Sequence, residues 1–113
     1  MASLTLNLPQ GSVTFRYSPS AAQTLKKEID QLMRSLKTIA AKVKDGDRPE
    51  KQASMEYRYA GEVFIEVFCN PNLYPSPFAA KVLLTIRDDK IRLTTEAELP
   101  RLLEDLTQYL EQV

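Results

Sequence analysis

Apolar and polar residues alternate in six short stretches of this sequence. These stretches cover residues 3–8, 13–17, 55–59, 62–68, 79–87 and 90–94. Alternation with a period of two is typical of a β-strand that buries one face. The short connections between successive stretches favour antiparallel pairing. Turn residues at 9–12 predict that the first two strands form a hairpin, and Ala60-Gly61 is either a tight turn or a β-bulge.

A longer stretch, residues 20–44, has the spacing of a helix with one apolar side. Its apolar positions are Ala22, Leu25, Ile29, Leu32, Leu36, Ile39 and Val43. Met33 and Ala40 widen this stripe, which favours packing on a sheet over a narrower coiled-coil seam. Leu32 and Leu36 lie in the middle of the stripe, so both are expected in the core.

Two signals mark the start of this helix. Ser18-Pro19 would be an N-cap followed by a first-turn proline, and Ser20 with Gln23 would be a capping box. Gly46 is expected to end the helix, because glycine readily adopts the left-handed conformation that follows a last turn.

A second helix is predicted from about Thr95 to Glu111, with Thr95 and Glu98 as a capping box. Its apolar stripe consists of Leu99, Leu102, Leu103, Leu106, Leu110 and Val113. Pro100 conflicts with this start, since a proline just past the first turn removes a helical hydrogen bond. The alternatives are an irregular first turn and a regular helix that begins near Pro100.

These elements predict one α+β domain over residues 1–113, with the order ββ-α-ββββ-α. The expected architecture is an antiparallel sheet of four to six strands. Each helix has a single apolar stripe, so both helices are expected on one face of that sheet.

The composition limits the chemistry that this chain can perform. Apolar residues make up 43% and charged residues 27% of the chain, which is typical of a globular protein. The absence of histidine excludes Ser-His-Asp and Cys-His nucleophiles and any imidazole metal site. No catalytic residue, metal ligand or cofactor is therefore expected, and Cys69 is interpreted as a small hydrophobic residue.

The expected location is the cytoplasm. Cys69 is the only cysteine, so no intrachain disulfide can form, which fits a reducing compartment. The N-terminal residues lack a basic patch followed by an apolar run, and no stretch reaches the length of a membrane span. Neither a signal peptide nor membrane insertion is expected.

Charge is unevenly distributed although the net charge is zero. Residues 1–60 hold ten basic and six acidic residues, and residues 61–113 hold five and nine. A stripe of Lys26, Lys27, Arg34 and Lys37 could bind an anion such as nucleic acid. A solvated helix face is the favoured interpretation, because no stacking aromatic residues lie among these charges. Attraction between a basic first helix and an acidic second helix would explain the asymmetry.

Alternation in the fourth strand places large apolar residues on the sheet face without helices. If Val63, Ile65 and Val67 face the helices, Phe64 and Phe68 face away, and Leu83 does the same in the next strand. Glu62 and Glu66 share that face, where Lys81, Arg87 or Arg92 are their expected partners. The apolar residues are either a partner surface or are covered by the loop 69–78.

The loop 69–78 is the second candidate contact region. Its three prolines restrict the conformations available to it, so Leu73 and Tyr74 could be presented to a partner at low entropic cost. The sequence favours a non-catalytic module, such as an assembly factor, adaptor or regulatory subunit, that binds another protein through this loop and the helix-free face. A twofold homodimer through that face is a further possibility. The alternatives are anion binding by the first helix and a small enzyme without histidine.

Overall fold

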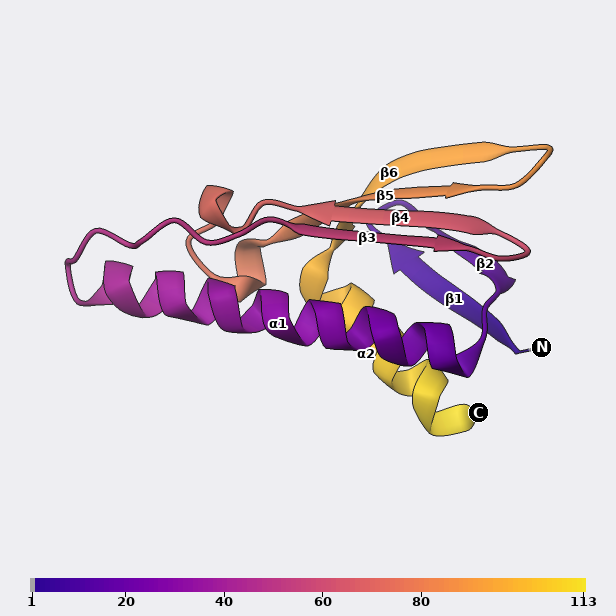
Figure 1. Cartoon of the computed structure of the whole chain (residues 1–113), viewed down its shortest axis with the longest axis horizontal. Coiled ribbons are helices and arrows are strands. Elements are labelled where there is room, and N and C mark those ends of the chain that lie inside the picture. The colour runs from indigo at the N-terminus through magenta and orange to yellow at the C-terminus, as the bar shows by residue number, and fades with distance from the viewer. Residues whose placement is uncertain (1) are drawn as a thin grey trace.

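A computed structural model describes residues 2–113 and confirms the order ββ-α-ββββ-α (Figure 1). The elements are β1 (Ser3–Leu8), β2 (Gly11–Arg16), α1 (Pro19–Lys44), β3 (Met55–Ala60), β4 (Phe64–Cys69), β5 (Lys81–Arg87), β6 (Arg92–Glu98) and α2 (Leu99–Gln112). Two 3₁₀ turns, η1 (Pro71–Leu73) and η2 (Pro77–Ala79), lie in the loop between β4 and β5.

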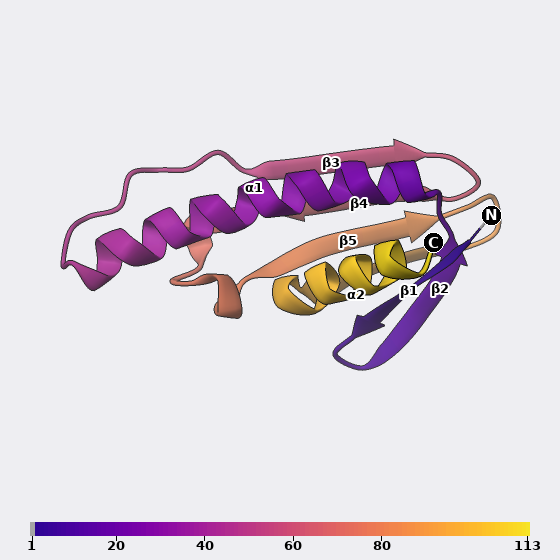
Figure 2. The ribbon, with the colours of Figure 1, turned by 90° about the horizontal axis from the view of Figure 1, so that it is seen from below.

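The strands form two antiparallel sheets. β3, β4, β5 and β6 pair in that order, and β1 pairs only with β2. Both helices lie on one face of the four-stranded sheet (Figure 1). Figure 2 looks at the sheet from the helix side, so α1 lies in front of β3 and β4. In the same view α2 lies beside α1, between β5 and the β1–β2 hairpin. The order of elements and the placement of both helices agree with the expectation from sequence.

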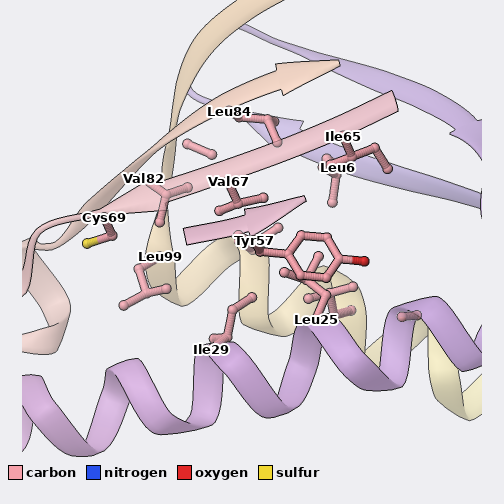
Figure 3. Packing of buried hydrophobic residues seen from close by; sticks show 14 of the residues in the cluster. Leu6, Leu25, Ile29, Tyr57, Ile65, Val67, Cys69, Val82, Leu84 and Leu99 are labelled. Carbon is pink, nitrogen blue, oxygen red and sulfur yellow. The ribbon is translucent and has the colours of Figure 1, made fainter. Parts of the chain in front are cut away.

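The core fills the space between the sheet and the helices. Leu25 and Ile29 of α1 point toward Tyr57, Val67 and Leu84 of the sheet (Figure 3). Leu32 and Leu36 are buried as expected, and Leu4 and Leu6 of β1 are buried in the same cluster. The wide apolar stripe of α1 therefore packs inside its own chain.

The first of the two start signals of α1 is the correct one. The N–H of Ala21 donates to the Ser18 side-chain oxygen at 3.1 Å, and Pro19 occupies the first turn. At the other end Gly46 has a φ of 77°, which is the left-handed conformation expected after the last turn.

The regular helix that begins near Pro100 is the confirmed alternative, and the start at Thr95 with a capping box was wrong. Thr95 and Glu98 belong to β6, which pairs with β5 as far as Glu98 opposite Lys81. The helix begins at Leu99, whose N–H donates to the carbonyl oxygen of Ala80 at 3.0 Å, and Pro100 lies in its first turn. Residues 95–98 pair with β5, so their backbone groups are not available to form the first turn of a helix.

Other strand boundaries differ slightly from prediction. β2 begins at Gly11, and β5 begins at Lys81 because residues 77–79 form η2. Ala60-Gly61 leads into a turn between β3 and β4, so it is not a bulge. A Cβ at Gly61 would lie 2.5 Å from the Tyr59 hydroxyl oxygen, so a larger residue would displace that ring.

A buried carboxylate attaches the N-terminal hairpin to α2. Asp105 accepts hydrogen bonds from the Asn7 backbone N–H at 2.8 Å and from Asn7 Nδ2 at 2.9 Å. Arg101 Nε lies 3.3 Å from the same carboxylate. Because the partners satisfy the buried charge, this cluster is structural.

A cluster of tyrosines closes the other side of the core. Tyr17 is fully buried, and its hydroxyl lies 2.5 Å from that of Tyr57. Tyr109 donates to the carbonyl oxygen of Tyr17. Burial raises the pKa of the Tyr17 and Tyr57 hydroxyls, which fits hydroxyls that stay protonated and hydrogen-bonded.

Candidate interaction face

The candidate site is the helix-free face of the β3–β6 sheet, called here the outer face. Its side chains form rows across the four strands, which follow from the strand register. One row runs Glu56, Phe68, Leu83 and Glu96 from β3 to β6. Two large apolar side chains are therefore direct cross-strand neighbours, with a carboxylate on either side.

Phe68 and Leu83 are the exposed large apolar residues of this face. Phe68 is 37% exposed and Leu83 is 48% exposed, whereas Phe64 is half-buried. The face assignment from alternation is confirmed. The alternative that the loop 69–78 covers these residues is wrong, because its two 3₁₀ turns pack against α1 and α2.

The middle row of the outer face contains an ion pair between its own side chains. It runs Arg58, Glu66, Thr85 and Thr94, and Arg58 Nε lies 2.8 Å from Glu66 Oε2. The expected partners of Glu66 were Lys81, Arg87 and Arg92, and that expectation was wrong. The register explains this, because Arg58 of β3 lies directly opposite Glu66, whereas the residue opposite Glu66 in β5 is Thr85.

The third row places positive charge at the other end of the face. It runs Ala60, Phe64, Arg87 and Arg92. The Arg87 guanidinium carbon lies 4.2 Å from the centre of the Phe64 ring, which is a cation–π contact. The outer face thus has an acidic, apolar end near Phe68 and a basic end near Arg87.

The loop 69–78 presents one of its two predicted contact residues. Leu73 is 71% exposed, whereas Tyr74 is half-buried against the core. Phe78 of the same loop is 88% exposed and is a further apolar side chain open to solvent. Side-chain hydrogen bonds hold the loop, since the Asn72 carboxamide donates to Gln52 O at 2.7 Å and accepts from Gln52 N–H at 2.8 Å.

The basic stripe of α1 is weaker than its sequence suggested. Lys26 Nζ lies 3.1 Å from Asp30 and is partly neutralised by it, while Lys27, Arg34 and Lys37 are exposed. Every ion pair among residues 2–113 lies within one helix or between β3 and β4. The expected attraction between the two helices is therefore not realised as an ion pair.

Cys69 lies on the inner face at the end of β4. Its side chain is buried, and burial raises the pKa of the thiol to about 11. A thiol with so high a pKa is protonated at neutral pH and is a poor nucleophile. Cys69 is therefore a core residue.

The described part of the chain has neither a metal-binding cluster nor a membrane-spanning helix. Within residues 2–113 no group of three or more cysteine, aspartate or glutamate side chains is placed to hold a metal ion. No helix of that region combines the length and the apolarity that crossing a bilayer requires. Comparison with protein-family models, with curated proteins and with solved structures found no significant match.

Proposed function

We propose that this protein is a non-catalytic module that binds another protein through the acidic, apolar end of its outer face. The observation that carries the proposal is the pair Phe68 and Leu83, which lie side by side and keep 37% and 48% of their surface exposed. A solvated sheet face normally carries polar side chains at such positions. Adjacent exposed apolar residues bordered by charges are typical of interaction surfaces.

The charges beside this pair define the chemistry of the partner. Glu56 and Glu96 lie at the two ends of the row, and no ion pair in the described structure neutralises them. A complementary surface would present an apolar side chain between lysines or arginines. The loop 69–78 leaves β4 directly after Phe68, so Leu73 is the proposed second contact.

Site-specific photocrosslinking tests this proposal. A photoreactive residue at position 83 should crosslink one protein in the native cell, and the same residue at position 91 should not. Ile91 is the matched control, because it is also an exposed apolar residue but lies in the β5–β6 turn.

A charge reversal then tests whether the captured protein recognises this row. Glu96→Arg should lower crosslinking at position 83 by about tenfold, because it places like charges opposite one another. Equal capture from positions 83 and 91, or capture that Glu96→Arg leaves unchanged, would contradict the proposal.

A further inference from the structure

The two edges of the four-stranded sheet are unequally protected. β6 is partly covered by the β1–β2 hairpin, whose Leu8 lines a shallow cleft with Leu93. β3 lies at the margin of the molecule in Figure 2, and among the described residues no strand pairs with its free edge. An unpaired edge exposes backbone N–H and C=O groups that can pair with another strand.

The residues of β3 are complementary to a second copy of the same strand. Glu56 and Arg58 face outward on either side of Tyr57, and both are exposed. In an antiparallel pair of two β3 strands with Tyr57 opposite Tyr57, each Glu56 lies opposite the Arg58 of the other copy. This register therefore creates two cross-strand pairs of opposite charge. In each, Arg58 lies between Glu56 of the other copy and Glu66 of its own chain, with which it already pairs at 2.8 Å.

Neighbouring registers are disfavoured by the same charges. A shift by one residue would place outer-face side chains opposite inner-face side chains, which the pleat forbids. Centring the pair on Glu56 or on Arg58 places two glutamates or two arginines directly opposite one another. The register centred on Tyr57 overlaps residues 55–59 of both strands, with Met55 opposite Tyr59 on the inner face; the register centred on Arg58 overlaps as many residues, so the charges decide between them.

We propose that two copies of this chain dimerise by antiparallel pairing of their β3 edges around a twofold axis at Tyr57. The axis is perpendicular to the sheet, so the dimer has one continuous eight-stranded sheet with all four helices on one side. Both outer faces point the same way and stay open. The dimer therefore does not depend on the binding proposed above, and it would present two copies of the Phe68–Leu83 pair on one surface. Because the dimer pairs Glu56, Glu96 is the carboxylate of that row that stays available to the partner.

Charge exchange at the edge tests this proposal by sedimentation equilibrium at micromolar concentrations. Wild type should sediment as a dimer, and Glu56→Arg or Arg58→Glu alone should raise the dimer dissociation constant by about tenfold or more. An equimolar mixture of the two single variants should form a heterodimer. One variant then carries two arginines at its edge and the other carries two glutamates, so that each arginine lies opposite a glutamate. The double variant E56R/R58E should also dimerise, since it exchanges the two charges within each chain.

A matched variant distinguishes a dimer formed through the β3 edge from a dimer formed through the outer face. Glu96→Arg is the same substitution in the same cross-strand row but on β6, so it should leave the dimer unchanged. Circular dichroism checks that each variant is folded. A monomeric wild type, a mixture that fails to associate, or a dimer weakened by Glu96→Arg would each overturn edge pairing, and the last outcome would assign the dimer to the outer face. Crosslinking from position 83 tests the other proposal separately.

Discussion

Val67 and Phe68 are neighbours in β4, and Leu84 and Leu83 are neighbours in β5, yet the members of each pair lie on opposite faces of the sheet. Val67 and Leu84 are fully buried beneath the helices, whereas Phe68 and Leu83 remain in contact with solvent. The four side chains are all apolar. Their different environments depend on what covers each face, so hydrophobicity alone does not tell a core residue from a contact residue.

The largest loss of stability is expected from a substitution on the inner face of the sheet. Leu84→Ala should lower the free energy of unfolding by about 2–5 kcal/mol, because it removes buried contacts and leaves a cavity between the sheet and the helices. Urea denaturation followed by circular dichroism measures this change. A loss below about 1 kcal/mol would show that the site is not close-packed.

An intermediate loss of stability is expected from removing a buried hydroxyl on the inner face. Tyr57→Phe removes the hydroxyl that bonds Tyr17 and should cost about 1 kcal/mol at neutral pH. Tyr59→Phe is the control, because Tyr59 lies on the same strand and its ring makes a T-shaped contact with the ring of Tyr17. It should cost less than Tyr57→Phe, and equal losses would assign the effect to ring packing.

The same substitution should change the response to alkaline pH. The pKa of Tyr57 is raised in the folded state, so the unfolded chain releases the proton first as pH rises. The resulting stability is complete below the unfolded pKa and is lost as pH rises through the folded pKa. The pKa of Cys69, raised from 9.0 to about 11, acts in the same direction. Wild-type urea midpoints should therefore fall as pH rises above 9.0, the unfolded pKa of Cys69. Above 10.0, the unfolded pKa of Tyr57, the midpoints of Tyr57→Phe should fall less steeply than those of wild type.

The smallest change in stability is expected from a substitution on the outer face. Leu83→Thr should change the free energy of unfolding by no more than about 0.5 kcal/mol, because the side chain is half exposed and threonine suits a strand. The measurement is the same urea titration that is used for Leu84→Ala, one residue away. A loss close to that of Leu84→Ala would mean that the outer face is covered and would remove the contrast between the faces.

Much of this structure follows from local patterns. The alternation in β4 and β5 predicted which side chains share a face, and the stripe of α1 predicted Leu32 and Leu36 as core residues. Backbone geometry makes these inferences possible, since successive strand residues point to opposite faces and helix residues three or four apart share one. The capping signal at Thr95 was misleading because residues 95–98 pair with a strand, whereas Pro100 correctly indicated where α2 begins.

Contacts between distant residues could not be predicted in this way. Asp105 bonds Asn7 across 98 positions, and Tyr109 bonds Tyr17 across 92. Nothing in the sequence near Asp105 shows that the charge is buried and paired. The same limit applies to Glu66, whose partner Arg58 became evident only with the order of the strands.

Local sequence patterns were enough to predict the helices and strands, the face to which each strand residue points, and the absence of histidine chemistry. The packing of the loop 69–78 toward the helices, the exposure of Phe68 and Leu83, and the unpaired edge of β3 became evident only in the folded chain. The physical reason is that a side chain's direction depends on its own backbone, whereas its exposure depends on segments that are distant in the chain. Both proposed interaction surfaces are defined by that exposure.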